Sequence, residues 1–582
     1  MNSETRICQN CKKDFTIEPE DFSFYEKLKV PAPTFCPDCR LQRRLAWINE
    51  RSLYFRNCSL CNKRIMSMYA KNSPYEVYCS SCYHGDKWEG TEYGISFNFN
   101  KTFFEQFNEL QAITPKVNLE QSQNYKVESE YANHVFSRSK NIYLSFIIVR
   151  CEDCMYSKMG ANGNKGCLDC FNFNGNERCY ELSFSGENYE SVFLIDSHSC
   201  VHSLFLYDCK NCTNCFMSTH LRNKSYIFRN KQLSREDYLR EISKIKTENW
   251  SVFENLKKEF KEISLNTFKR YATIVNSLNS TGDLIFDSKN IKNSFSVVDS
   301  ENVKYTIFNA GGAIDVYDMI YSGKNEQGYE LLVSGARNFN ASFSFQVTKS
   351  KDVFYSFWCN NCSNIFGCIG LKNKQYCILN KQYTKEEYER LLQKIIENMN
   401  TQPYVDKKGR VYKYGEFFPI ELSSFAYNES LAYEEFPMKK QEAIEQGYIW
   451  RDNEEKYYKA SIESRELTDS LNDISDNILS ETIACPNKGQ IETKCTFAYK
   501  IMPEELLFYR LMHIPLPHYC PNCRYYERRK WKNSWKLWHR TCMCDKENHQ
   551  HQGKCEVEFE TSYAPDRSEI IYCERCYQQE VY

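Results

Sequence analysis

Glycine, proline and histidine are scarce in this sequence, and its charges nearly cancel. The 582 residues include 21 Gly and 15 Pro, too few for a collagen-like or low-complexity protein. With 75 Lys and Arg against 76 Asp and Glu, the net charge is -1, so any site for an anionic partner must be local. No apolar run approaches the roughly 20 residues of a membrane span, and no apolar signal segment follows Met1. We therefore expect a cytoplasmic protein.

Sequence motifs of common enzymes are also missing. The chain contains no P-loop, no G-x-S-x-G and no H-E-x-x-H, and its 10 His offer few general bases. These absences argue against the nucleotide hydrolases, serine hydrolases and zinc proteases that those motifs mark. We expect a protein that is not an enzyme.

Cysteine is the residue that the chain has in excess, with thirty copies. In a reducing compartment, paired cysteines indicate metal sites before they indicate disulfides. Before residue 83 they form four C-x-x-C pairs, and two such pairs complete a tetrahedral zinc site. Pairing in sequence order predicts one zinc ion on Cys8, Cys11, Cys36 and Cys39, and a second on Cys58, Cys61, Cys79 and Cys82.

The C-terminal region is a second copy of this double module. A shift of 484 residues places the segment from Cys11 to Cys58 on Cys495 to Cys542 without a gap, and a shift of 494 places Cys61, Cys79 and Cys82 on Cys555, Cys573 and Cys576. The overlay predicts two further zinc sites whose first knuckles are widened by insertions. Their ligands are Cys485, Cys495, Cys520 and Cys523 in the third site, and Cys542, Cys555, Cys573 and Cys576 in the fourth. Four sulfur ligands leave no open position, so all four ions are expected to be structural.

One insertion leaves Cys544, His549 and His551 without a place in the overlay. Two interpretations stay open. The three residues are spare side chains on the surface, which we favour, or they replace Cys542 or Cys555 as ligands.

The residues after Cys39 predict a helix with two different faces. From Arg40 to about Tyr54 the chain has no Gly or Pro, and a knuckle that leads directly into a helix is typical of treble-clef and zinc-ribbon modules. One face carries arginines and a tryptophan, which can neutralise phosphates and stack on bases. The candidate nucleic-acid residues are Arg40, Arg43, Arg44, Trp47 and Arg51 in the first copy, and Arg524, Arg528 and Trp531 in the second. Alternatively, these arginines pair with local carboxylates or pack on their own tryptophan.

The middle of the chain is duplicated as well. With a shift of 150 residues, the C-x-x-C pair at Cys209 lies on the pair at Cys359, and each copy then begins a helix with a capping box, at Ser234 or Thr384. Within each copy, a template of about a dozen residues recurs. A repeat of this length with one small apolar position resembles the rungs of a parallel β-solenoid.

The central cysteines allow two interpretations. On the solenoid model they stack in the interior as small apolar side chains, namely Cys154, Cys170, Cys179, Cys200 and Cys212. The alternative is a further metal site built from Cys151, Cys154, Cys167, Cys170, Cys209, Cys212 and Cys215. The irregular spacing, and the Ile and Val at matching positions of the other half, favour the apolar column.

The chain as a whole resembles an uncharacterised family of zinc-ribbon, treble-clef-like proteins found mainly in small-genome candidate-phylum bacteria. The resemblance is carried by Cys8-x-x-Cys11, Pro31-x-Pro33-x-x-Cys36-Pro-Asp-Cys39-Arg40, Tyr563-Ala-Pro-Asp-Arg567 and Tyr572-Cys-x-x-Cys-Tyr577. It implies zinc-ribbon modules and implies almost nothing about activity.

The predicted fold class is α+β and rich in strands, with duplicated treble-clef or zinc-ribbon modules at both ends of a duplicated, β-solenoid-like middle with helical insertions. An amphipathic helix over 249–270 is expected to join the two halves. The expected units are an N-terminal double zinc module (1–90), a first solenoid-like half (91–246), a second half (247–400), a mixed aromatic region and linker (401–480) and a C-terminal double zinc module (481–582).

The predicted function is a non-enzymatic zinc-binding scaffold that contacts RNA or single-stranded DNA through the Arg and Trp faces. One alternative is a protein–protein interaction scaffold without nucleic acid. The other is a β-solenoid enzyme that acts on polysaccharides with Asp196, Asp208, Asp315 or Asp318, although no pairing of these carboxylates is visible in the sequence.

Overall fold

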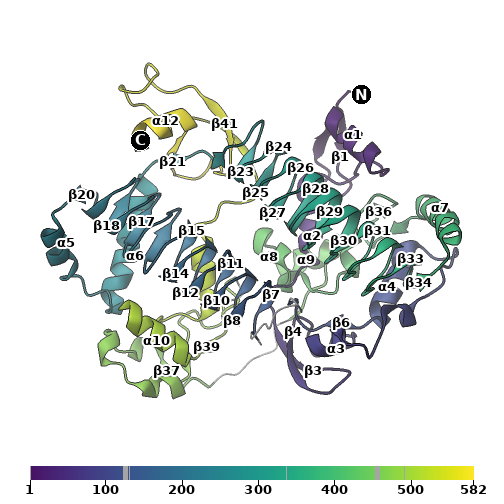
Figure 1. The fold of residues 1–582 in the computed structure, drawn as a ribbon, viewed down its shortest axis with the longest axis horizontal. Helices are drawn as coiled ribbons and strands as arrows, with labels where there is room; N and C mark the ends of the chain where they lie inside the picture. Colours follow the sequence, from purple (N-terminus) through teal and green to yellow (C-terminus); the bar gives the residue numbers. More distant parts are fainter. Residues whose placement is uncertain (1, 122–128, 130, 336, 453–458, 491) are drawn as a thin grey trace.

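Two curled sheets of mainly parallel strands form the centre of the molecule, with smaller cysteine-bearing modules from both ends of the chain around them (Figure 1). The computed structural model describes all residues except 1, 122–128, 130, 336, 453–458 and 491. Met159 and Phe171 of one sheet belong to the same hydrophobic cluster as Phe295 and Ile307 of the other. The two sheets therefore share a core, and the predicted strand-rich mixture of α and β structure is present.

The first sheet has 14 strands, and neighbouring strands are offset by about a dozen residues. Val192 pairs with Leu204, and Leu204 pairs with Phe216. Its strands are β7 (Asn133–Phe136), β8 (Lys140–Tyr143), β9 (Phe146–Val149), β10 (Glu152–Met155), β11 (Lys158–Ala161), β12 (Lys165–Leu168), β13 (Phe171–Asn174), β14 (Glu177–Tyr180), β15 (Ser183–Gly186), β16 (Val192–Ile195), β17 (Leu204–Tyr207), β18 (Thr213–Thr219), β19 (Ser225–Phe228) and β20 (Lys231–Gln232). This register matches the dozen-residue template of the sequence.

The second sheet has 13 strands and the same kind of register. Ile291 pairs with Val303, and Val303 pairs with Val316. Its strands are β22 (Ile274–Val275), β23 (Gly282–Phe286), β24 (Lys289–Lys292), β25 (Ser294–Val298), β26 (Glu301–Lys304), β27 (Ile307–Asn309), β28 (Ile314–Ser322), β29 (Asn325–Leu332), β30 (Asn338–Phe345), β31 (Lys351–Phe354), β32 (Ser363–Phe366), β33 (Gln375–Ile378) and β34 (Lys381–Gln382).

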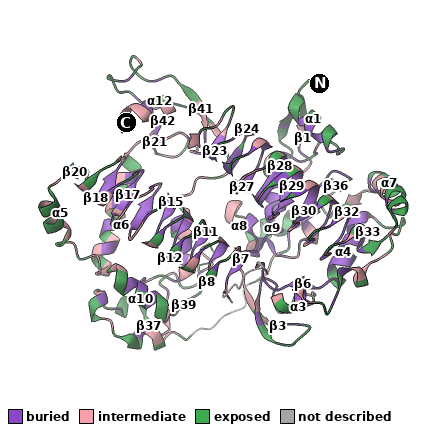
Figure 2. Ribbon diagram, in the orientation of Figure 1, coloured by how far each residue is buried: buried purple, intermediate pink, exposed green. Residues whose placement is uncertain are grey.

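Small side chains line the interior of both sheets, which is buried along its length (Figure 2). The Ser197 hydroxyl donates to the carbonyl of Ile195 and accepts from the amide of Cys209, one rung further along. Cys167 pairs in register with Cys179, and both are fully buried. Serine hydroxyls therefore satisfy interior backbone groups, while the cysteines fill the space between them as small apolar side chains.

Left-handed residues recur at every third position, both between the short strands and inside them, as Asn214 does in β18. Asp208, Asn211 and Asn214 have φ values of 51°, 54° and 53°. Asn and Asp adopt this conformation more readily than other residues with a Cβ. The frequent Asn and Asp of the template therefore occupy positions with left-handed backbone conformation.

Helices cap and join the two sheets. Ser234 and Thr384 cap α5 (Arg235–Ile242) and α7 (Lys385–Thr401) by accepting from backbone amides, as the capping boxes predict. The predicted joining helix is α6 (Trp250–Asn266), which buries Phe253, Leu256 and Phe260 against the first sheet. Among the described residues, no helix has both the length and the apolar character needed to span a bilayer.

The N-terminal module contains short hairpins and helices. Its elements are β1 (Glu4–Ile7), β2 (Asp14–Ile17), α1 (Pro19–Lys27), α2 (Pro37–Leu45), β3 (Tyr54–Asn57), β4 (Arg64–Ser67), β5 (Val77–Tyr78) and α3 (Ser80–His84), followed by α4 (Phe103–Ile113) and β6 (Lys116–Val117). The helix predicted to run to about Tyr54 ends at Leu45, so that prediction is wrong in its second half. The reason is a turn in which the Asn49 side chain accepts from the amide of Ser52 and donates to the carbonyl of Met68.

The C-terminal module repeats this arrangement. Its elements are β38 (Ile483–Ala484), β39 (Ala498–Tyr499), α10 (Pro503–Met512), α11 (Pro521–Arg529), β40 (Trp538–Thr541), β41 (Glu558–Thr561), β42 (Ile571–Tyr572) and α12 (Glu574–Val581). The segment between the second sheet and this module includes β35 (Tyr404–Val405), β36 (Val411–Tyr412), α8 (Leu431–Glu435), α9 (Lys440–Glu445) and β37 (Ile462–Glu463). Phe417 and Phe418 of this segment are fully buried.

Candidate metal centres and central cavity

The structure brings the sixteen predicted cysteine ligands together in four groups of four, grouped as the sequence predicts. Within each group the sulfur atoms lie within 4.8 Å of one another. Representative Sγ–Sγ distances are 3.7 Å for Cys11–Cys36, 3.8 Å for Cys61–Cys79, 3.9 Å for Cys495–Cys520 and 3.9 Å for Cys555–Cys573. Four sulfurs about 2.3 Å from one ion at tetrahedral angles stand about 3.8 Å apart. The donor sets therefore fit a metal ion that prefers tetrahedral thiolate ligands.

The same local geometry supports all four groups. The third ligand of each group is the N-cap of a helix, and its amide donates to the sulfur of the first ligand. These amide contacts are Cys36 to Cys8 (3.3 Å), Cys79 to Cys58 (3.2 Å), Cys520 to Cys485 (3.4 Å) and Cys573 to Cys542 (3.2 Å). Helix N-termini and N–H donors favour the thiolate, which is the form that binds metal. Burial raises the pKa of the Cys58 thiol, but the amides of Cys79 and Cys61 outweigh burial and lower this pKa to about 7.

The leftover residues of the fourth module are not spare surface side chains. Cys544 is fully buried and His549 is 7% exposed. Cys542 and Cys555 keep their places in the fourth group, while Cys544, His549 and His551 gather around Cys576. The first interpretation is therefore wrong for Cys544 and His549, which are buried. The second stays a prediction, because Cys576 belongs to both groups.

The predicted nucleic-acid face of α2 is buried against the second sheet. Arg40, Arg43 and Arg44 are at most 2% exposed. Asp318 binds Arg40 at 2.8 Å and Arg44 at 2.8 Å, and Glu330 binds Arg43 at 2.8 Å. The prediction that these arginines form an open surface is wrong, because they neutralise carboxylates that the second sheet buries.

The equivalent arginines of α11 are buried in the same way against the first sheet. Arg524 Nε lies 2.9 Å from Asp169 Oδ2, and Arg528 Nη1 lies 2.6 Å from Asp169 Oδ1. Arg524 and Arg528 align with Arg40 and Arg44 at a shift of 484 residues. Asp169 aligns with Asp318 at a shift of 149 residues. The duplication therefore includes both sides of this interface, the arginines of the module and the aspartate of the sheet.

The remaining candidate residues have different surroundings. Trp47 is 2% exposed and contacts Phe417 and Phe418. The guanidinium of Arg51 lies 3.7 Å from the ring centre of Tyr525. Trp531 is half-buried and lines a cavity. Of the eight predicted residues, three line this cavity, namely Arg524, Arg528 and Trp531, and the two arginines are buried.

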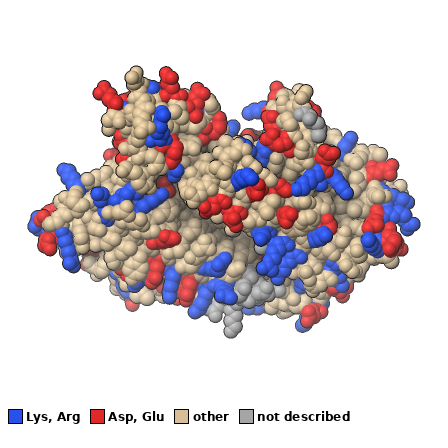
Figure 3. Space-filling model, turned by 45° about the horizontal axis from the view of Figure 1, so that its top comes forward, with Lys and Arg blue, Asp and Glu red and all other residues tan. Residues whose placement is uncertain are grey.

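A cavity of about 540 Å³ lies where the first sheet, α6, the start of the second sheet and the C-terminal module meet. This volume is typical of small-molecule sites. Its wall includes Trp250, Trp531 and Trp535 together with the lysines of α6 and Lys269. Ten Lys and Arg line it against seven Asp and Glu. Three carboxylates outside the lining, Asp169, Glu435 and Glu574, pair with lining cations and offset this excess. Figure 3 shows both signs of charge interspersed over one face of the molecule, which is hollowed between two raised modules.

Two buried groups in this wall carry shifted pKa values. Burial lowers the pKa of Lys269 to about 7; its ammonium donates to the Ser264 carbonyl and lies 3.4 Å from the ring centre of Tyr207. Burial also raises the pKa of Glu181. The positive charges of Lys257 and Arg528 lower this pKa, but they offset the effect of burial only in part.

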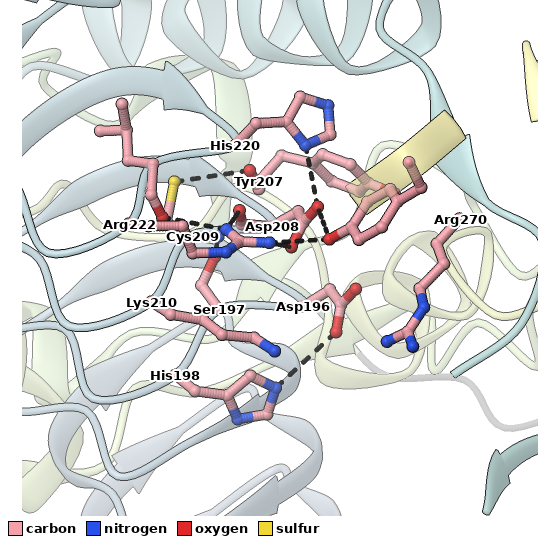
Figure 4. A network of polar contacts seen from close by, with 12 residues as sticks. Asp196, Ser197, His198, Tyr207, Asp208, Cys209, Lys210, His220, Arg222 and Arg270 are labelled. Carbon is pink, nitrogen blue, oxygen red and sulfur yellow. Dashed lines mark hydrogen bonds and ion pairs between the residues drawn. The ribbon is translucent and has the colours of Figure 1, made fainter. Parts of the chain in front are cut away.

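A polar network surrounds Asp208, which lines the cavity (Figure 4). Asp208 accepts from Arg222 at 2.8 Å and from the Tyr577 hydroxyl at 2.5 Å, and its Oδ2 lies 2.8 Å from His220 Nδ1. Burial alone raises the pKa of Asp208, but the hydrogen bond with His220 and the charge of Arg222 lower it overall. Asp196 lies in the same view and is 3.7 Å from His198.

The carboxylates considered for a polysaccharide-active enzyme are spread over two places. Asp196 and Asp208 line the cavity. Asp315 pairs with Lys27, and Asp318 is buried under Arg40 and Arg44. Asp318 is therefore engaged in holding the N-terminal module.

No protein-family model matches this chain, and no curated protein matches it. The resemblance to a zinc-ribbon family stays a prediction that rests on the cysteine motifs, which the four groups fit.

Proposed function

We propose that this protein is a non-enzymatic binding scaffold that four zinc ions hold in shape, with the central cavity as its ligand site. On this proposal the end modules are zinc ribbons or treble clefs, and the curled sheets are β-solenoids. The cysteine-only donor sets support zinc in closed, structural sites.

One difference between the two copies carries the proposal. In the N-terminal copy, Trp47 is covered by Phe417 and Phe418. Its equivalent Trp531 contacts Phe193 and Phe260 at 6.4 and 6.2 Å between ring centres, yet it stays half-buried and lines the cavity. The space beside this tryptophan is therefore filled in the N-terminal copy, where Trp47 is 2% exposed, and partly open in the C-terminal copy, where Trp531 is half-buried.

The composition of the cavity favours a ligand that is both aromatic and anionic, and single-stranded nucleic acid is the class that we propose. Lys258 and Lys261 of α6 line the cavity, are exposed and have no ion-pair partner within the described residues. Trp531 and Trp535 add aromatic surface. Proteins that bind single-stranded nucleic acid without sequence preference combine positively charged side chains with aromatic rings on which bases stack.

The test is a titration of a labelled single-stranded RNA at several salt concentrations, followed by fluorescence anisotropy. We expect the double variant Lys258→Ala, Lys261→Ala to weaken binding and to reduce the salt slope by roughly 0.7 for each lost phosphate contact. The control is Lys385→Ala, Lys394→Ala, which removes exposed lysines of α7.

Equal weakening by both double variants, or no binding at low salt, would contradict a nucleic-acid ligand in this cavity. A protein partner is the alternative outcome. It would show as capture that survives nuclease treatment and is lost on Trp531→Ala, with little dependence on salt.

A further inference from the structure

We propose that Cys544, His549, His551 and Cys576 bind a fifth metal ion, and that this ion shares the Cys576 thiolate with the fourth cysteine group. The four donor atoms lie within 4.8 Å of one another, and Cys576 belongs to both groups. Two thiolates and two imidazoles are a closed donor set typical of structural zinc. The pair of ions would form one cluster in the C-terminal module.

The imidazole of His549 is oriented as a metal ligand would be. Its Nδ1 lies 3.1 Å from Cys544 Sγ, and its Nε2 lies 3.0 Å from Oε1 of Glu580. The side chain is 1% exposed. Histidines that bind metal through one ring nitrogen usually direct the other to a carboxylate or carbonyl, which fixes the ring and its tautomer. Glu580 of α12 places a carboxylate beside that nitrogen, at ion-pair distance and outside hydrogen-bond geometry.

His551 shows the same arrangement with a backbone partner. Its Nδ1 lies 2.8 Å from the carbonyl oxygen of Gly553, which requires that nitrogen to carry the proton. Nε2 is then the free lone pair, and it is buried without a hydrogen-bond partner among the described residues. A buried imidazole nitrogen without a partner is costly unless something binds it, and a metal ion at the cluster would do so.

The insertion that carries these residues explains why one module has an extra site. Cys542 and Cys555 flank it, whereas Cys58 and Cys61 of the other copy are separated by two residues. The amide of Cys555 donates to the carbonyl of Cys544 at 2.8 Å, which closes the insertion back onto the knuckle. Sharing Cys576 also reduces the buried charge. Four thiolates around one divalent ion carry a net charge of -2, whereas five thiolates around two divalent ions carry a net charge of -1.

The experiment measures zinc per chain in protein purified without chelators. We expect His551→Ala to hold one equivalent less than the unmodified protein. The matched control is His539→Ala, an exposed histidine on β40 of the same module, which should hold the full amount. Equal zinc contents in the His551→Ala variant and the unmodified protein would overturn the proposal.

Because His551→Ala could also loosen the module, a second measurement uses the unmodified chain loaded with cobalt(II). Two cobalt ions that share a thiolate couple magnetically, so the paramagnetic signal per cobalt should fall as the last equivalents bind. A signal that stays proportional to bound cobalt up to saturation would overturn the shared site.

Discussion

Arg528 Nη1 lies 2.6 Å from Asp169 Oδ1, deep in the interface between the C-terminal module and the first sheet. The equivalent contact, Arg44 to Asp318 at 2.8 Å, fastens the N-terminal module to the second sheet. Each module thus holds the sheet that stands further from it in the sequence. The chain closes on itself through two copies of one contact, and the helices that carry cysteines of the four groups make it.

Breaking either contact should be costly, because it leaves a buried charge without a partner. We expect Asp169→Asn and Asp318→Asn each to destabilise the fold by about 3–5 kcal/mol, measured by denaturant unfolding. The double variant Arg528→Met, Asp169→Leu should recover part of the loss, because the buried Arg524 then keeps, among the described residues, only Glu505, at 3.4 Å, as its carboxylate partner. Glu109→Gln, which breaks an exposed ion pair with Lys101, should leave stability unchanged. Equal effects at the buried and exposed pairs would refute the role of the buried contact.

Lys269 predicts a pH dependence in a defined direction. Burial lowers its pKa in the folded chain to about 7, whereas the unfolded chain keeps the ordinary value near 10.4. Between these values the unfolded state binds more protons, so the contribution of Lys269 to stability rises with pH.

The variant Lys269→Met removes this slope. We expect it to be more stable than the unmodified protein at and below pH 7, and the advantage should shrink by up to about 1.4 kcal/mol per pH unit above pH 7. Unfolding midpoints from pH 6 to 9 measure it. An advantage that is constant over this range would show that Lys269 keeps its proton in the cavity wall.

The interior cysteines of the first sheet should tolerate an apolar replacement. Cys154 and Cys167 correspond to Val303 and Val316 of the second sheet at a shift of 149 residues, and all four are buried. Cys154→Val and Cys167→Val should each cost less than about 1.5 kcal/mol and leave the metal content unchanged. Loss of a metal equivalent in either variant would establish a metal site inside the sheet.

The sequence predicted the cysteine groups because their information is local and repeated. Spacing defines each knuckle, and the overlay of the two ends resolves the widened knuckles at Cys485 and Cys542. The dozen-residue register was predictable for the same reason, since each rung repeats its neighbour.

Burial of the arginines was not predictable from their helix alone. Arg44 and its partner Asp318 are 274 residues apart, and a charged helical face looks the same whether water or a buried carboxylate lies opposite. One signal was available: Arg44 and Arg528 match in the overlay of the ends, and Asp318 and Asp169 match in the overlay of the halves. The cavity had no such signal in the sequence. The segment with Phe417 and Phe418 packs on Trp47 of the N-terminal copy, and neither overlay indicates which copy it covers.

The most direct test of a metal-held scaffold is the metal content of the chain, compared between the unmodified protein and single variants of each cysteine group. Cys11→Ser, Cys61→Ser, Cys495→Ser and Cys555→Ser each remove one ligand from one group. We expect at least four tightly bound zinc ions per chain and a lower zinc content in every variant, with hydrogen exchange increased in the module concerned. Two or fewer ions per chain, or a variant that keeps the full amount, would contradict the account.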